Sequence, residues 1–156
     1  KKINWDLKDI IPCEFPSNCR PRLEVLFSNN DVVKAGNSDI EIETYGGDDK
    51  IIGSQVPRDI DAGDGDDYIL THTSDRLTGG AGEDIFAFSS SANGATISDF
   101  EVGKDQIKLK GKGFDSVEVK SEYSRVNYRP ETLLSWGDES VVRLLGVEAS
   151  YEDIFG

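Results

Sequence analysis

This chain of 156 residues has no methionine, one histidine, two cysteines and few cations. Lysine and arginine together number 17 against 30 aspartates and glutamates, so the formal net charge is −13. That excess of acid argues against nucleic-acid binding, which needs basic surfaces. No segment is long and apolar enough to span a membrane, so we expect no transmembrane segment. The hydrophobic fraction of 37% is low for a packed core in a chain of one-domain length.

Catalytic motifs are also missing. The sequence contains no H-E-x-x-H, no G-x-S-x-G and no plausible cysteine–histidine pair. The single histidine, His72, is expected to be an exposed loop residue. We therefore expect no enzymatic activity in this chain. It starts at Lys1 without a methionine, and we interpret it as the C-terminal part of a larger exported protein, whose missing N-terminal part could carry an enzyme or toxin activity.

What the sequence does contain is a repeat. Large apolar residues recur nine residues apart, with one spacing of eight, at Val33, Ile42, Ile51, Ile60, Ile69, Leu77 and Phe86. A fixed period of this kind indicates an array of structural units. Each unit consists of a six-residue loop and a three-residue strand whose central residue points inward. Two units per turn predict an all-β fold, a right-handed parallel β-roll (β-helix) with one thin core.

Alternate loops differ in composition. The loops 26–31, 44–49, 62–67 and 79–84 lie at one edge of the predicted roll and end in Asp31, Asp49, Asp67 and Asp84. We call these the odd loops. The even loops, 35–40, 53–58 and a shortened 71–75, carry Ile40, Arg58 and Asp75 at the matching position. The pattern predicts a metal site at the odd edge only, with ordinary turns and Arg58 as a built-in cation at the even edge.

The chemistry of the odd loops suits calcium. This ion takes six to eight oxygen ligands from carboxylates and backbone carbonyls, and glycine lets a loop turn its carbonyls to one side through positive φ. The alternative is that glycine- and aspartate-rich runs form simple turns. Four copies in register favour the metal site, and folding that depends on calcium would follow because crowded acids repel one another without a cation.

The motifs resemble a known family. Residues 26–110 look like the calcium-binding β-roll domains of RTX (repeats-in-toxin) proteins, and the stretch from Ala95 to Leu109 resembles the segment that closes such rolls. The resemblance implies that Asp99 and Asp105 help to bind the last calcium. It predicts two to four Ca²⁺ ions, most securely between loops 62–67 and 79–84, because loop 26–31 has no glycine and loop 44–49 lacks the leading glycine pair. The candidate metal-binding residues are Asp31, Tyr45, Gly47, Asp49, Ala62, Gly63, Asp64, Gly65, Asp67, Gly79, Gly80, Ala81, Gly82, Asp84, Asp99 and Asp105.

The remaining segments are expected to be caps. We predict an N-terminal cap over residues 1–25, the β-roll over 26–96, and a C-terminal cap over 97–156 with strands at 117–119, 125–128, 132–136 and 140–145. Cys13 and Cys19 are expected to form a small disulfide loop, the alternative being two free thiols. The tail 151–156 resembles the C-terminal signal of type I secretion substrates.

Two functions are open at this stage. The first is a module that folds on binding calcium after type I secretion, and that stabilises the C-terminus of a larger exported protein. The second is an extracellular adhesion or polysaccharide-binding module with a surface glycan or host-cell ligand. The expected partner of the first is the type I secretion machinery, and the expected location is secreted or cell-surface. The outward strand positions, taken together, are mixed and slightly acidic, which gives little support to a polyanion ligand: Lys34, Glu41, Glu43, Lys50, Asp59, Asp61, Tyr68 and Leu70.

Overall fold

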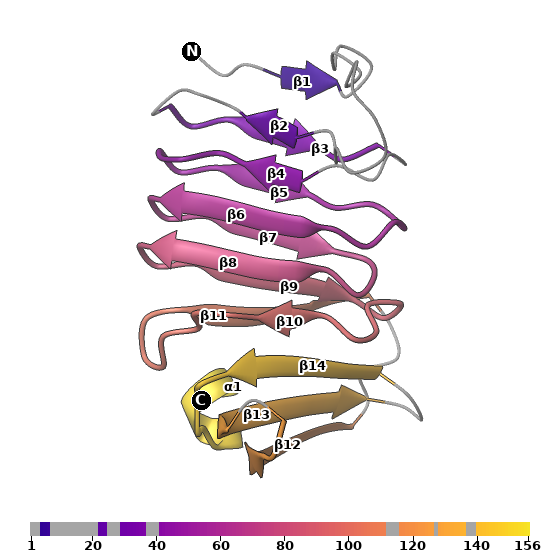
Figure 1. Cartoon of the computed structure of the whole chain (residues 1–156), viewed down its shortest axis with the longest axis vertical. Coiled ribbons are helices and arrows are strands. Elements are labelled where there is room, and N and C mark those ends of the chain that lie inside the picture. Colours follow the sequence, from indigo (N-terminus) through magenta and orange to yellow (C-terminus); the bar gives the residue numbers. More distant parts are fainter. Residues whose placement is uncertain are drawn as a thin grey trace.

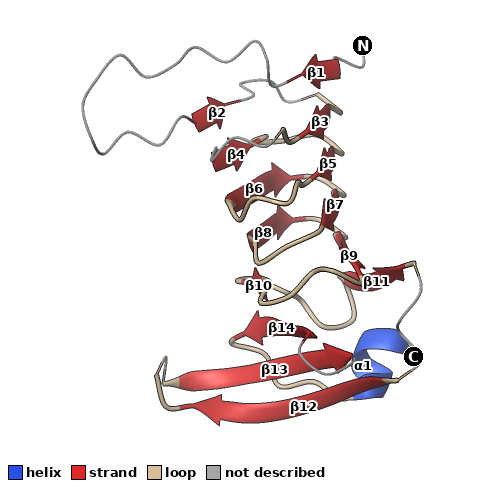
Figure 2. Cartoon of the chain, turned by 90° about the vertical axis from the view of Figure 1, so that its right-hand side faces the viewer, coloured by secondary structure: helices blue, strands red, loops and turns tan. Residues whose placement is uncertain are grey.

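The computed structural model describes residues 4–6, 22–24, 29–36, 41–111, 116–126, 128–136 and 140–156. These residues form two stacked sheets that face each other along the length of the molecule (Figures 1 and 2). Sheet A has the order β1 (Asn4–Asp6), β3 (Val32–Lys34), β5 (Lys50–Ile52), β7 (Tyr68–Thr71), β9 (Ile85–Ser89) and β11 (Gln106–Lys110). Sheet B has the order β2 (Arg22–Glu24), β4 (Glu41–Glu43), β6 (Asp59–Asp64), β8 (Arg76–Ala81), β10 (Thr96–Ile97), β14 (Ser140–Leu145), β13 (Arg129–Trp136) and β12 (Val117–Ser124).

Successive strands of the repeat alternate between the two sheets. Each strand pairs in parallel with the strand two places further along the chain, so that Val33, Ile51 and Ile69 lie side by side in sheet A. In sheet B, Ile42 lies beside Ile60 and Ile60 beside Leu77. Two repeat units therefore make one turn, which confirms the parallel β-roll predicted from the nine-residue period.

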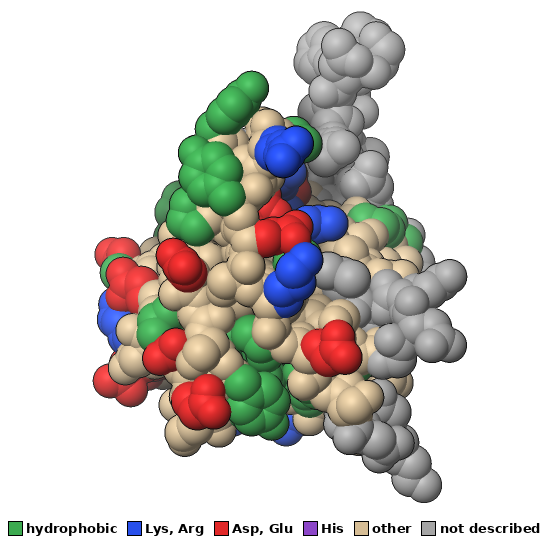
Figure 3. Space-filling model, turned by 90° about the horizontal axis from the view of Figure 1, so that it is seen from below, with side chains coloured by type: hydrophobic (Ala, Val, Ile, Leu, Met, Phe, Trp, Pro, Cys, Tyr) green, Lys and Arg blue, Asp and Glu red, His purple; other side chains and the backbone are tan. Residues whose placement is uncertain are grey.

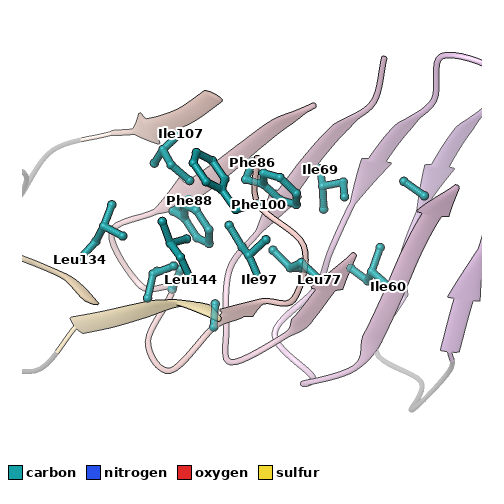
Figure 4. Packing of buried hydrophobic residues seen from close by; sticks show 14 of the residues in the cluster. Ile60, Ile69, Leu77, Phe86, Phe88, Ile97, Phe100, Ile107, Leu134 and Leu144 are labelled. Atoms are coloured by element: carbon teal, nitrogen blue, oxygen red, sulfur yellow. The ribbon is translucent and has the colours of Figure 1, made fainter. Parts of the chain in front are cut away.

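The core is the thin layer between the sheets. The seven periodic apolar residues are all at most 1% exposed. Side chains from both sheets point into the same layer, and aromatic rings widen it towards β9 (Figure 4). There Phe86 lies 6.2 Å from Phe100, centroid to centroid, and Phe88 lies 6.2 Å from Trp136. The two aromatic pairs join the roll to the segments that follow it.

Antiparallel strands and a short helix close the C-terminal end. β14 extends sheet B by pairing in parallel with β10, and β13 and β12 then add in antiparallel order. Strands at 117–119, 132–136 and 140–145 were expected and are confirmed. The strand expected at 125–128 is wrong, because Arg125, Val126 and Tyr128 lie in the turn between β12 and β13. Helix α1 (Tyr151–Phe155) begins with a capping box in which Ser150 and Asp153 bind each other's backbone N–H groups.

The roll also has strands before residue 26. β1 pairs with β3, and β2 pairs with β4, so both continue the parallel sheets at the N-terminal end. The division into cap, roll and cap at residues 25 and 96 stays a prediction. Cys13 and Cys19 lie outside the described residues. Within the described ranges, the structure offers no helix with the length and apolarity that crossing a bilayer requires.

Candidate metal centre at the odd edge of the roll

The aspartates that end the odd loops form a hydrogen-bonded ladder. Asp31, Asp49, Asp67 and Asp84 are buried, each at most 2% exposed. The Oδ1 atom of each later aspartate accepts a hydrogen bond from the backbone N–H of the aspartate one turn before it. The N···O distances are 2.7 Å from Asp31 to Asp49, 2.7 Å from Asp49 to Asp67, and 3.0 Å from Asp67 to Asp84. We call this row the inner carboxylate ladder.

The closing segment completes the ladder at its C-terminal end. Asp105 accepts a hydrogen bond from the backbone N–H of Asp84 at 3.1 Å and another from that of Glu101 at 2.8 Å. Asp99 accepts from the N–H groups of Gly79 and Gly80 at 3.1 and 2.8 Å. Both acids named from the family resemblance are therefore brought to the last odd loop.

Several buried oxygens of the ladder have no hydrogen-bond partner among the residues that the structure describes. They are both carboxylate oxygens of Asp31 and the Oδ2 atoms of Asp49 and Asp67. The hydroxyl of Thr44, which lies near Asp49, already donates to the carbonyl oxygen of Ala62 at 2.7 Å. A buried acceptor without a donor is costly, and this orphaned set is what a cation with oxygen ligands would satisfy.

The electrostatics of the ladder lead to the same conclusion. Burial, with a smaller contribution from the neighbouring acids, raises the pKa of Asp67 to about 7 and the pKa of Asp84 to about 6. Burial also raises the pKa of Asp31, Asp49 and Asp105. Removing carboxylates from water disfavours their charged form. The charged ladder is therefore destabilising unless a positive charge lies beside it.

The loop backbone is shaped by residues in the left-handed region. In the row formed by Tyr45, Gly63 and Gly80, the φ angles are 65°, 96° and 100°. A Cβ atom at Gly63 would collide with the carbonyl oxygen of Tyr45, and one at Gly80 with that of Gly63. Carbonyl groups of one loop thus approach the next loop closely, where only glycine fits. A second such row has φ values between 105° and 150° at Gly47, Gly65 and Gly82.

The other candidate residues take part through their backbone. Asp64 donates its N–H to Tyr45 at 2.9 Å and accepts from Gly47 at 2.7 Å, while Ala81 accepts from Gly65 at 2.7 Å. These bonds hold successive loops in register. Gly79 leaves room for the carboxylate of Asp84, because a Cβ atom there would meet it. The structure thus brings the predicted odd-edge residues together along one edge.

A second ladder runs outside the first and was not foreseen. The side chains of Asn30, Asp48 and Asp66 accept hydrogen bonds from the backbone N–H of Asp48, Asp66 and Glu83, at 3.1, 3.1 and 2.8 Å. Its acceptors lie one turn earlier than their donors, the reverse of the inner ladder. The signal was present in the sequence, since these residues recur at the same period, one position before each ladder aspartate.

Side chains alone do not form a metal site in the described ranges. No three carboxylate, histidine or cysteine side chains converge there as ligands would. The residues present nevertheless fit a calcium ion, because buried carboxylate oxygens without donors end loops whose carbonyl oxygens approach the next loop closely. Backbone carbonyls would have to supply the rest of the coordination.

The even edge is built differently. Arg58 is buried, at 3% exposed, and its guanidinium donates to the carbonyl oxygens of Gly36 and Val56 at 3.0 and 3.2 Å and to the hydroxyl of Ser54. Asp75 accepts from the backbone N–H of Arg58 at 3.0 Å, in the register expected after the one-residue deletion. A guanidinium thus lies among the even-edge carbonyls, as the sequence suggested.

A parallel roll of nonapeptide units with glycine and aspartate at one edge defines a class, the RTX-type β-roll. The family model that describes the C-terminal domain of the serralysins, peptidase family M10, matches residues 28–153. The chain belongs to this family, whose β-rolls generally bind calcium. The matched family domain is not a catalytic domain.

A search of curated protein sequences returns no match. Among solved structures, the chain is similar to the solution structure of the AlgE6R2 subunit from the Azotobacter vinelandii mannuronan C5-epimerase. The two are 22% identical, the match covers 88% of this chain and 92% of that one, and the TM-score is 0.33.

Proposed function

We propose that this chain is a calcium-binding module that folds when calcium binds after type I secretion, and that stabilises the C-terminal part of a larger exported protein. The observation that carries the proposal is the inner carboxylate ladder, with its buried oxygens that lack donors. The family supports it, because the chain belongs to the serralysin C-terminal domains. Its partner in export would be the type I secretion machinery, and its location secreted or cell-surface.

The ladder explains why folding would wait for calcium. Calcium would supply positive charge and accept the orphaned oxygens of Asp31, Asp49 and Asp67 as ligands, together with loop carbonyls. The acids of the ladder would otherwise be buried as repelling charges. A chain low in apolar residues has little burial to offset that cost. In a compartment poor in calcium the chain would stay unfolded, in a state suited to export.

The test is circular dichroism with calcium and after chelation. We expect β-structure in calcium and its loss in chelator, since a ligand that binds only the folded state stabilises it by about 2.7 kcal/mol at a hundredfold excess over Kd. An unchanged β-rich spectrum and melting temperature in chelator would contradict the proposal. Export is tested separately, by following secretion of a reporter fused to this chain in cells with and without a type I exporter.

A second function, binding of an acidic polysaccharide, gains support from the way the roll sorts its charges. The outward positions of sheet A carry lysine on β3, β5 and β11 and no acid in any described strand from β3 to β11. The outward positions of β4 and β6 in sheet B carry the acids instead: Glu41, Glu43, Asp59 and Asp61. The outward strand positions looked slightly acidic when they were taken together only because that set combined two opposite faces of the molecule.

The basic face of sheet A has a regular order. One row of neighbours across the strands is Lys34, Ile52, Leu70, Ala87 and Lys108. In the adjacent row Lys50 lies beside Tyr68, with its Nζ atom 5.4 Å from the ring centroid. Strands about 4.8 Å apart place the two end lysines about 19 Å apart. We propose that the lysines of these two rows, together with the ring of Tyr68, bind an extended polyanion.

Glycan binding in calcium tests this second function. Titration with a polyuronate and with a neutral polysaccharide of similar length should show binding of the acidic chain only. Lys50→Glu should weaken that binding, whereas Arg76→Gln on the opposite sheet should not. Equal affinity for the two polysaccharides would contradict the second function without touching the first, which depends on calcium alone.

A further inference from the structure

The hairpin of β12 and β13 ends in an unusual exposed tip. Three large apolar side chains at this tip are the most exposed of their kind in the described chain: Val126 at 85%, Tyr128 at 78% and Tyr123 at 64%. The turn stands out beyond the strands of the roll (Figure 2). Seen from the end that carries β12 and β13, hydrophobic and basic side chains gather on a projection at the top of the view (Figure 3). No described residue covers these apolar groups, given their exposure.

The tip is held in one conformation. The hydroxyl of Tyr123 donates a hydrogen bond to the carbonyl oxygen of Tyr128 at 2.7 Å, and the N–H of Tyr128 donates to Ser124 at 3.0 Å. Tyr128 has a φ angle of 53°, in the left-handed region where glycine or asparagine is usual. A bulky residue there costs free energy, and burial does not offset that cost. Burial of the ring therefore does not explain why a tyrosine occupies this position.

Charge sets the tip apart from the rest of the molecule. Residues 123–130 read YSRVNYRP and hold Arg125 and Arg129 but no acid, in a chain whose net charge is −13. Both arginines are exposed. The tip therefore combines local positive charge with an aliphatic group and two aromatic rings.

We propose that this tip docks the folded module on an anionic phospholipid surface. Tyrosine favours the interface between membrane and water, an aliphatic tip can enter the acyl boundary, and basic residues are attracted to anionic headgroups. The tip is convex, so its apolar groups are covered only by a medium that closes around them. A lipid interface does this without a matching shape, and the two arginines on either side of Val126 favour an anionic one.

Flotation of the calcium-saturated chain with lipid vesicles tests the proposal. The chain should float with vesicles of phosphatidylcholine and phosphatidylserine and much less with phosphatidylcholine alone. The variant Arg125→Gln/Arg129→Gln should bind about thirtyfold more weakly, the factor expected for two basic residues near the surface. The variant Val126→Asp/Tyr128→Asp should lose binding. Tyr151→Ser, which removes a half-exposed ring from α1, should bind as the parent does.

The variants are expected to fold, because the tip side chains bury little, and their calcium-dependent circular dichroism should match the parent's. A Val126→Trp variant should show fluorescence quenching by bromine-labelled acyl chains if the tip inserts. Binding of the Val126→Asp/Tyr128→Asp variant at parental strength would overturn the proposal, as would the absence of anionic-vesicle binding by the parent. A tip that binds a soluble acidic protein or glycan while ignoring vesicles would also overturn it.

Discussion

At the scale of single residues, position in the ladder decides what each aspartate does. The carboxylate of Asp67 accepts a hydrogen bond from the backbone N–H of Asp49, and its own N–H donates to the carboxylate of Asp84. Asp67 therefore connects the turn before it to the turn after it. Asp31 donates to Asp49, but its own carboxylate oxygens accept no hydrogen bond in the described structure. The same residue type thus holds the stack together in the middle and ends it at the N-terminal side.

Asp67→Ala should therefore weaken calcium-dependent folding more than Asp31→Ala. The first change removes a ligand from the middle of the proposed site and leaves the buried N–H of Asp49 without an acceptor, a loss of about 1–3 kcal/mol. The second removes a carboxylate that accepts no hydrogen bond. A calcium titration of β-structure measures both midpoints. Equal midpoints, or a larger shift for Asp31→Ala, would mean that the calcium ligands are not arranged along this ladder.

The ladder also predicts an unusual response to pH. The pKa of Asp67 rises from 3.8 to about 7 in the folded chain, and the pKa of Asp84 rises to about 6, chiefly because both are buried. A raised folded pKa stabilises the folded state fully below the unfolded pKa, and this contribution disappears as pH rises through the folded value. Without calcium, β-structure should be greatest near pH 4 and decline towards pH 7.

With calcium the dependence should reverse, because protons compete with the cation for the same carboxylates. The midpoint of a calcium titration should move to lower calcium as pH rises across this window. Far-ultraviolet circular dichroism at several pH values, in calcium-free buffer and in calcium, measures both trends. A calcium-free chain with less β-structure at pH 4 than at pH 7 would contradict the raised pKa values.

At the scale of the loop, the close approach between turns has more effect than the backbone angle alone on the cost of replacing a glycine. Gly80 and Gly103 both have positive φ, at 100° and 81°. A Cβ atom at Gly80 would strike the carbonyl oxygen of Gly63, whereas one at Gly103 would meet nothing within 4 Å. A comparison of the two glycines therefore distinguishes the cost of backbone strain from the cost of a steric collision.

Gly80→Ala should be far more destabilising than Gly103→Ala. The Gly103 variant should lose about 1–2 kcal/mol, the cost of a side chain in the left-handed region. The Gly80 variant adds a steric collision inside the stack, so it should lose several kcal/mol more, or need much more calcium to fold. Denaturant unfolding in saturating calcium compares the two, and similar losses would show that the loops do not pack as closely as described.

At the even edge, we predict a loss of stability that added calcium does not restore. Arg58→Gln removes a buried guanidinium that binds Gly36, Val56 and Ser54, so those groups lose their donors. We expect a loss of about 2–4 kcal/mol, the range for a broken buried charge network. Thermal unfolding should show this loss even at saturating calcium. Full rescue by added calcium would mean that an ion takes the place of the guanidinium at this edge.

Much of the roll could be predicted from sequence because the nine-residue period fixes the sheet face or the edge on which each residue lies. Val33, Ile51 and Ile69 had to share a face, and the aspartates two residues before them had to share an edge. The turn that contains Arg125, Val126 and Tyr128 was mistaken for a strand because valine and tyrosine favour strands, while the positive φ of Tyr128 has no sequence signal. The separation of lysines from acids was missed although the period contained it, since alternate units face opposite ways. Helix α1 was missed too, although Ser150 and Asp153 have the spacing of a capping box.

At the scale of the whole molecule, the acids that give the net charge of −13 lie in two different environments. Some acids lie at the surface, such as Asp48, Asp61 and Asp66, and others are buried in the ladder. Salt screens exposed charges over about 10 Å at 0.1 M but has little effect on buried ones. The dependence of folding on salt therefore reports which set of acids matters.

Sodium chloride should not replace calcium. If the ladder controls folding, raising the salt concentration in chelator should restore little β-structure, whereas calcium should restore it at far lower concentration. Magnesium should also do poorly, because it requires octahedral geometry and holds its water. Circular dichroism under the three conditions makes the comparison. Recovery of the full spectrum in sodium chloride would assign the calcium effect to general screening.

The direction of the inner ladder has a further consequence, which concerns the order of assembly. Every buried N–H of the ladder finds its acceptor on the turn that follows it, and only the last one, that of Asp84, is satisfied by a segment outside the repeats, through Asp105. A turn added at the N-terminal side thus meets a carboxylate already in place, whereas a turn at the C-terminal side without its successor leaves a donor open. For the inner ladder, we therefore expect the closing segment to act as the nucleus of folding, on which the repeats assemble towards the N-terminus.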